Sequence, residues 1–166
     1  MPRIWRKRIE LDKYHRDEDG YIRGDRPCTK ILVHYQFTPK YRKDISVYPG
    51  LLKALGLCIQ DICDYNNWYI DSLAIETDHV HLCVQLPPTV TVSDGARIIK
   101  CNSSRMIREA YPELRKDLNK SSFWGKHFFA KTVGDVDFER TKRYIENQGI
   151  YRYSAPLCGG RKPTRL

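Results

Sequence analysis

Two histidines separated by one residue, His79 and His81, lie in a segment in which apolar and polar residues alternate without a break. Side chains on a β-strand point alternately to its two faces, so Val80 and Leu82 share one face and both histidines share the other. Neutral imidazole is a common metal ligand, and two imidazoles on one face can converge on a single divalent cation. The alternative interpretation is a pair of surface histidines on a half-exposed strand, because a motif this short often matches by chance.

A second group of reactive side chains lies near the end of the chain, where residues 137–148 have the periodicity of a helix. Phe138 and Ile145 belong to its apolar stripe. Tyr144 and Gln148 are four residues apart, so a helix presents them on one side. A phenol oxygen that could attack phosphorus and a carboxamide oxygen that could bind a metal are thus predicted to be neighbours. The alternative is a surface tyrosine and a solvated glutamine, since the chain contains 11 tyrosines.

The elements that would position these residues are predicted in the order strand, helix, strand, strand, helix, strand, helix. This order predicts an α+β fold of the ferredoxin-like or RRM-like type. Such a fold has a four-stranded antiparallel sheet with two helices on one face, here with the tyrosine-bearing helix added at the C-terminus. We expect the other face, which would carry the two histidines, to be open to ligands. The predicted strands are 29–38, 68–76, 79–86 and 126–133, and the predicted helices are 51–65, 93–110 and 137–148.

The length of 166 residues suits one compact domain. We predict a basic extension at residues 1–27 that becomes ordered only on a partner, the domain itself at 28–150 and a basic tail at 151–166. No apolar run approaches the length of a transmembrane helix, and no apolar segment follows the basic N-terminus. We therefore expect a cytoplasmic protein with no membrane partner. The six cysteines form no C-x-x-C pair, which favours reduced thiols over a zinc site or disulfides.

The formal net charge of +9 and the pI of about 9.3 favour a polyanionic partner, because Lys and Arg bind phosphates and release their counterions. The same charge also fits a protein that merely has a basic surface. Basic side chains around the predicted site are candidate phosphate contacts, and several aromatic side chains could stack on unpaired bases. The phosphate candidates are Lys40, Arg42, Arg97, Lys100, Arg105 and Arg108, and the aromatic candidates are Tyr41, Trp68, Phe123 and Trp124.

Together, the histidine and tyrosine motifs resemble those of the single-tyrosine HUH transposases of bacterial and archaeal insertion sequences, the IS200/IS605-type TnpA proteins. The similarity runs in the family's order over roughly residues 30–150, which makes it more specific than one short motif. It includes the family's first strand with its Lys-Tyr-Arg turn, the histidine segment, the strand before the nucleophile helix and the nucleophile motif. These segments are residues 33–42, 78–82 followed by Pro87-Pro88, 123–134 and 144–148.

The resemblance implies that His79, His81 and Gln148 bind Mg²⁺ or Mn²⁺ and that Tyr144 is the nucleophile. It implies cleavage and rejoining of DNA through a 5′-phosphotyrosine, which stores the energy of the broken phosphodiester bond. The implied substrate is single-stranded DNA with a hairpin near the ends of a mobile element. The implied assembly is a homodimer, in which the tyrosine helix can serve the histidines of the other subunit.

Two other functions fit the same sequence features. One is a related HUH enzyme, either a replication or conjugation nickase that cuts without transposing, or a domesticated relative. The other is a non-catalytic RRM-like nucleic-acid-binding protein. Such a protein would stack bases on aromatic residues of its central strands, where this sequence has histidines instead.

Overall fold

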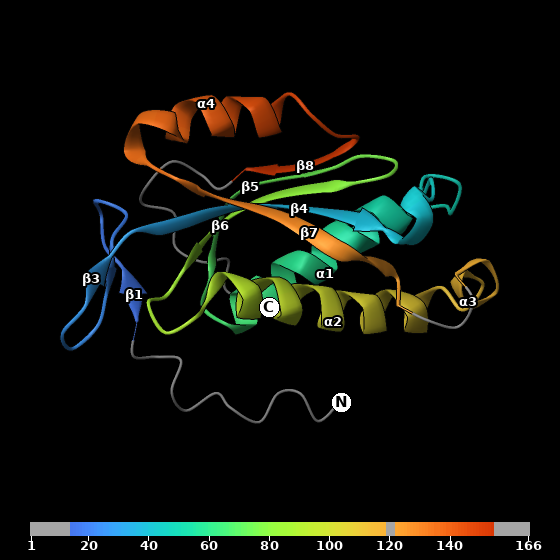
Figure 1. The fold of residues 1–166 in the computed structure, drawn as a ribbon, viewed down its shortest axis with the longest axis horizontal. Helices are drawn as coiled ribbons and strands as arrows, with labels where there is room; N and C mark the ends of the chain where they lie inside the picture. The colour runs from blue at the N-terminus through green and yellow to red at the C-terminus, as the bar shows by residue number, and fades with distance from the viewer. Residues whose placement is uncertain (1–13, 119–121, 155–166) are drawn as a thin grey trace, which may run out of the picture.

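The computed structural model describes residues 14–118 and 122–154. Its centre is a five-stranded antiparallel sheet in the order β7-β4-β6-β5-β8, with α1 and α2 on one face and α4 on the other (Figure 1). The mixed α+β fold with antiparallel strands is therefore confirmed. The strands are β4 (Ile31–Pro39), β5 (Tyr69–Ile75), β6 (Val80–Leu86), β7 (Trp124–Val133) and β8 (Tyr151–Ser154), and the helices are α1 (Leu51–Tyr65), α2 (Val92–Ala110), α3 (Leu114–Asp117) and α4 (Asp135–Glu146).

The larger core lies between the sheet and the helices α1 and α2. Val80 and Leu82 of β6 belong to it, as the alternation along this strand predicts. Gly50, with a left-handed φ of 77°, turns the chain into α1. The side chain of Thr91 caps α2, because its Oγ1 accepts a hydrogen bond from the backbone N–H of Asp94 at 3.0 Å. These two helices pack on one face of the sheet, and the histidines lie on the opposite face.

The sheet has one strand more than the four predicted, because residues 151–154 of the predicted tail pair with β5. β8 runs antiparallel to β5, with Tyr151 opposite Ile75. The ring of Tyr151 lies against Gly56 of α1, where any side chain would collide with it. Its hydroxyl accepts a hydrogen bond from Gln60 Nε2 at 2.9 Å. The prediction missed this strand because four residues in a basic tail carry too little periodicity to be recognised.

The histidine face of the sheet is covered, so the prediction of an open face was wrong. α4 lies across this face, and its Ile145 packs with Ala74 and Cys83 in a second, smaller core. Further along β6, Gln85 is fully buried, and its Nε2 donates a hydrogen bond to the carbonyl oxygen of Gly20 at 2.7 Å. The pattern along β6 does not predict this burial, because α4 and the loop with Gly20 are both distant from β6 in the chain.

Part of the predicted extension has regular structure within the chain itself. The short strands β1 (His15–Arg16), β2 (Ile22–Arg23) and β3 (Cys28–Thr29) form a separate antiparallel sheet. Ile22 is fully buried, and Arg16 forms an ion pair with Asp71 of β5 at 3.3 Å. The rest of the extension, residues 1–13, and the tail beyond residue 154 lie outside the described residues. None of the described helices is both long and apolar enough to cross a membrane.

Gly149, between α4 and β8, occupies a position where only glycine fits. Its φ is +91°, and a Cβ atom there would lie 3.0 Å from both Ala74 Cβ and Ile75 N. We expect Gly149→Ala to lower the free energy of unfolding by about 2 kcal/mol, because a left-handed conformation alone costs an L-residue about 1–2 kcal/mol. The control is Gly134→Ala, whose Cβ would meet nothing within 4 Å. It should change that free energy by less than about 0.5 kcal/mol. Urea unfolding measures both variants, and equal effects would contradict this interpretation of Gly149.

Candidate active site

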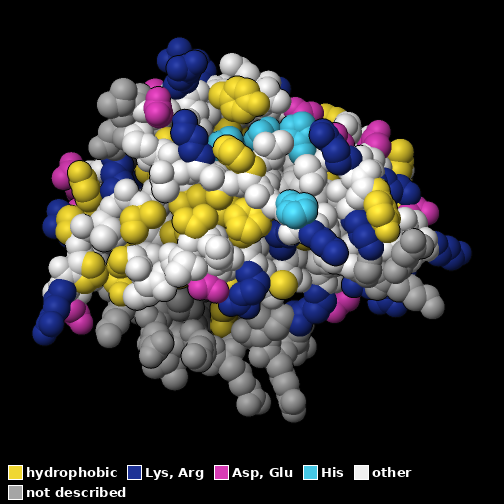
Figure 2. Space-filling model, viewed as in Figure 1, with side chains coloured by type: hydrophobic (Ala, Val, Ile, Leu, Met, Phe, Trp, Pro, Cys, Tyr) yellow, Lys and Arg dark blue, Asp and Glu magenta, His cyan; other side chains and the backbone are white. Residues whose placement is uncertain are grey.

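Three histidines lie together where α4 crosses the sheet. His81 of β6 is adjacent to His34 of β4, with His34 Nε2 3.0 Å from His81 Nδ1. His79, just before β6, has its ring centroid 4.9 Å from that of His81, with the two rings perpendicular. In Figure 2, histidine side chains gather near the upper edge of the molecule, with hydrophobic and basic side chains around them. The predicted pair is thus brought together, and His34 joins it.

His34 is not among the predicted site residues, although the sequence contains a signal for it. β4 alternates as β6 does, with Val33 and Tyr35 in the larger core and His34 on the opposite face. Because His34 pairs with Cys83, two residues beyond His81, its side chain reaches the predicted site. Only the pairing of β4 with β6 reveals this relation.

Burial keeps His34 and His81 neutral near pH 7. It lowers the pKa of His34, with a smaller contribution from the charge on Lys131. It also lowers the pKa of His81 to about 4, with smaller contributions from the positive charge that His34 and His79 carry when protonated. Only one hydrogen atom can then lie between His34 Nε2 and His81 Nδ1. When His81 donates it, the lone pair of His81 is on Nε2, a buried atom without a hydrogen-bond partner among the described residues.

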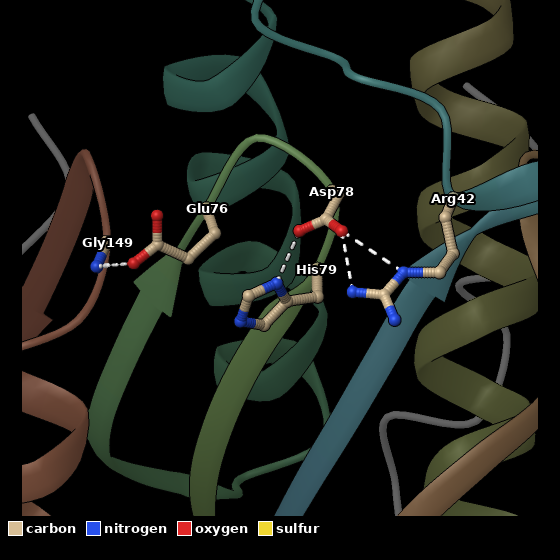
Figure 3. A network of polar contacts seen from close by, with 5 residues as sticks. All are labelled: Arg42, Glu76, Asp78, His79 and Gly149. Atoms are coloured by element: carbon tan, nitrogen blue, oxygen red, sulfur yellow. Dashed lines mark hydrogen bonds and ion pairs between the residues drawn. The ribbon is translucent and has the colours of Figure 1, made fainter.

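A carboxylate orients the imidazole of His79. Nδ1 of His79 donates a hydrogen bond to Asp78 Oδ1 at 2.6 Å, which leaves the lone pair on Nε2 (Figure 3). The hydrogen bond from His79, and next to it those from Arg42, hold the pKa of Asp78 below its usual range, so Asp78 is ionised at neutral pH. Both predicted histidine ligands can therefore present Nε2 to a cation.

Tyr144 of α4 lies next to His81 of the same chain. The centroids of the two rings are 5.6 Å apart, and the rings meet edge to face. Half of the Tyr144 surface remains exposed, with a relative accessibility of 50%, whereas His81 has 2%. The predicted nucleophile is thus reachable from solvent while it contacts a buried histidine.

The chain after α4 is attached closely to β5. The backbone N–H of Gly149 donates to the carboxylate of Glu76 (Figure 3). The N–H of Ile150 donates to the carbonyl oxygen of Ile75 at 2.9 Å. Immediately afterwards the chain enters β8. These contacts hold the C-terminal end of α4 beside the loop that carries His79.

Gln148 lies differently from the prediction, which placed it on one helix with Tyr144. α4 ends at Glu146, and the backbone N–H of Gln148 donates to the carbonyl oxygen of Ile145 at 3.0 Å. The side chain of Gln148 is half-buried. Within the described part of the chain, no hydrogen bond joins it to either predicted histidine ligand.

The donor set fits a divalent cation only if a ligand of another kind joins the histidines. No group of three or more His, Cys, Asp or Glu side chains in the described ranges is arranged to hold a metal ion. The two Nε2 atoms nevertheless suit the task, since both imidazoles can present a lone pair and that of His81 is buried without a partner. The carboxamide oxygen of Gln148 is the predicted third donor.

Most of the candidate phosphate contacts have partners within the chain. Arg42 pairs with Asp78, and Lys100 Nζ donates to backbone carbonyl oxygens of β7, the nearest being Gly125 O at 2.8 Å. The other candidates make longer contacts or are half-buried. They are Arg97 with Asp94 at 3.2 Å, Arg105 with Glu109 at 3.9 Å, and Lys40 Nζ 5.0 Å from the centre of the Tyr41 ring, while Arg108 is half-buried.

The aromatic candidates divide by burial. Trp68, Phe123 and Trp124 belong to the larger core, so they cannot stack on bases, and only Tyr41 is exposed. Besides Tyr144, the exposed ring of Phe129 on β7 also lies near the histidines, although Phe129 is not among the predicted aromatic candidates. It has a relative accessibility of 52%, and its centroid lies 6.3 Å from that of His34.

Comparisons with known proteins find similarity to transposases. A family model described as "Transposase IS200 like" matches residues 28–148. The transposase for insertion sequence element IS200 of Salmonella typhimurium is 29% identical over 115 residues, which are 69% of this chain and 74% of that protein. The ISDra2 transposase TnpA of Deinococcus radiodurans is 27% identical over 119 residues, which are 72% of this chain and 84% of that protein.

Two solved structures share the fold. One, a candidate transposase from Deinococcus radiodurans, has a TM-score of 0.62 and 24% identity, and the match covers 76% of this chain and 97% of that chain. The other, a REP-associated tyrosine transposase bound to a REP hairpin, has a TM-score of 0.53 and 16% identity, with coverage of 75% and 70%. The resemblance to this family is therefore confirmed, and the matched range includes His79, His81 and Tyr144, whose roles stay predictions. The chain belongs to the IS200-like transposase family.

Proposed function

We propose that this protein is a transposase that acts on single-stranded DNA, cleaving and rejoining the ends of an insertion sequence through a 5′-phosphotyrosine intermediate. In this proposal Tyr144 is the nucleophile, and His79, His81 and Gln148 hold Mg²⁺ or Mn²⁺. The distance of 5.6 Å between the rings of Tyr144 and His81 supports it best, because nucleophile and metal ligand must reach the same phosphate. Membership of the family supports transposition as the overall reaction.

The proposed reaction has two steps that mirror each other. The phenol oxygen of Tyr144 forms a bond to phosphorus and loses its proton, while the bond from phosphorus to the 3′-oxygen breaks and that oxygen leaves as a 3′-hydroxyl. In the second step a 3′-hydroxyl attacks the phosphotyrosine, and Tyr144 recovers its proton. A bound divalent cation supplies neutralisation of the phosphate charge and fixes the orientation of the phosphate.

A single strand with a hairpin is the substrate that we propose. The net charge of +9 suits a polyanion, and one structural neighbour is a REP-associated tyrosine transposase bound to a REP hairpin. The exposed rings of Tyr41 and Phe129 are suited to stack on unpaired bases beside the histidines.

We further propose that one chain supplies the whole active site. The contact between Tyr144 and His81 is made within the chain, and the attachment of Gly149 and β8 to β5 supports a helix that stays with its own sheet. The homodimer implied by the resemblance would then serve other purposes, such as holding two DNA ends together, and would not be needed to complete the site.

Tyr144→Phe should abolish a covalent protein–DNA adduct that wild-type protein forms with labelled hairpin DNA in the presence of Mn²⁺. DNA binding should persist, because the ring is retained and only the attacking oxygen is removed. Denaturing gel electrophoresis measures the adduct, and a gel-shift assay measures binding. Tyr21→Phe is the control, since Tyr21 lies just before β2 in the small N-terminal sheet, outside the proposed site. An adduct that survives Tyr144→Phe would show that another residue is the nucleophile.

A mixture of His81→Ala protein and Tyr144→Phe protein tests whether the site is built within one chain. We expect no recovery of cleavage, because each chain would lack one of the two groups that must act together. Cleavage of the labelled strand by the mixture is compared with each variant alone at the same total concentration. Restored cleavage would mean that the tyrosine helix of one chain serves the histidines of another.

A further inference from the structure

The turn that follows β4 is held in a backbone conformation that its residues rarely adopt. Tyr41 has a φ of 62° and Arg42 a φ of 50°, both in the left-handed region. Neither is a glycine, and L-residues in this region carry a steric cost. Two such residues in succession persist only where the surrounding structure holds them.

The contact that this turn makes possible is between Arg42 and Asp78, 36 residues later in the chain. Nε and Nη2 of Arg42 donate to Asp78 Oδ2 at 3.1 and 2.7 Å. Asp78 Oδ1 is left to accept the hydrogen bond from His79 Nδ1 (Figure 3). The guanidinium, the carboxylate and the imidazole thus form a continuous chain of hydrogen bonds that ends at His79.

Stability alone does not account for this arrangement. The side chains of Arg42 and Asp78 have relative accessibilities of 69% and 30%, and ion pairs so exposed contribute little to the free energy of folding. The conformational free energy of two consecutive left-handed residues is larger than the stabilisation that an exposed ion pair provides. Backbone strain of this kind is found where a side chain must be aimed at a functional group.

We propose that Arg42 and Asp78 are positioning residues, which hold the His79 imidazole in the tautomer and orientation that present Nε2 to the divalent cation. This inference rests on the proposed function, because it requires His79 to be a metal ligand. Carboxylates that bind the second nitrogen of a metal-bound histidine act in this way. Arg42 acts through Asp78: its two hydrogen bonds fix the rotamer of the carboxylate, which in turn fixes the ring.

The experiment measures Mn²⁺ binding to the full chain without DNA, by electron paramagnetic resonance of the free ion. We expect Asp78→Asn to raise the Kd for Mn²⁺ by about 10- to 100-fold, as for other partners of metal-bound histidines. Arg42→Ala should raise it less, and the double variant no more than Asp78→Asn, because both act through one ring. Arg97→Ala is the matched control, since Arg97 forms a comparable exposed ion pair with Asp94 on α2.

A second measurement reports the tautomer in metal-free protein. Nitrogen-15 NMR of the imidazoles should find hydrogen on Nδ1 of His79 in the wild type and a shift of it toward Nε2 in Asp78→Asn. Unchanged Mn²⁺ affinity and an unchanged tautomer in that variant would overturn the proposal. It would also be overturned if Arg42→Ala weakened only DNA binding, with a smaller salt dependence, because Arg42 would then be a phosphate contact alone.

His79→Ala separates the failure of this inference from the failure of the proposed function. If His79→Ala binds Mn²⁺ as the wild type does, His79 is not a ligand, and the metal site of the proposed function fails together with the positioning role. If His79→Ala loses affinity while Asp78→Asn keeps it, the metal site stands and only the positioning role is wrong. Thermal unfolding of each variant verifies that the chain remains folded.

Discussion

The pairing of β8 with β5 is the interaction on which the arrangement of the site depends. α4 follows β7 at one edge of the sheet and leads to β8 at the other, so the helix is joined to strands at both ends. A helix connected to both edges has to cross the strands between them. Its Ile145 then packs on the sheet, and Tyr144, one residue earlier, lies over His81 near the middle of the sheet. Without β8, the chain after Gly149 would have no strand partner on β5.

The cover that α4 provides also explains which partners the histidines have. A neutral imidazole has one N–H to place, and a buried N–H must find an acceptor. His81 is buried and is joined by one hydrogen bond to another neutral imidazole, that of His34. His79 lies nearer the surface, where Asp78 can remain ionised with help from Arg42. The more deeply buried ring, His81, thus has a neutral partner, and the more exposed ring, His79, has a charged one.

Patterns within one strand or helix could be predicted from the sequence, whereas relations between elements could not. The face shared by His79 and His81 follows from strand geometry, which is local. The position of His34 beside His81 could not be predicted, because it depends on the register between β4 and β6, which no single strand specifies. β8 gains its structure only from β5. Trp124, a predicted stacking candidate, is buried, because the local sequence does not distinguish a buried aromatic residue from an exposed one.

If Tyr144 stays beside the histidines of its own chain, the DNA has to move during strand exchange and the protein does not. In the proposed reaction the cleaved 5′ end becomes joined to Tyr144, and a helix attached at Gly149 and β8 would keep that end stationary. The second DNA end must then come to the first. Phe129 of β7, half exposed near His34, would then face the arriving end. The protein would hold the first end in place, and the movement of the second DNA end would limit the rate of strand exchange.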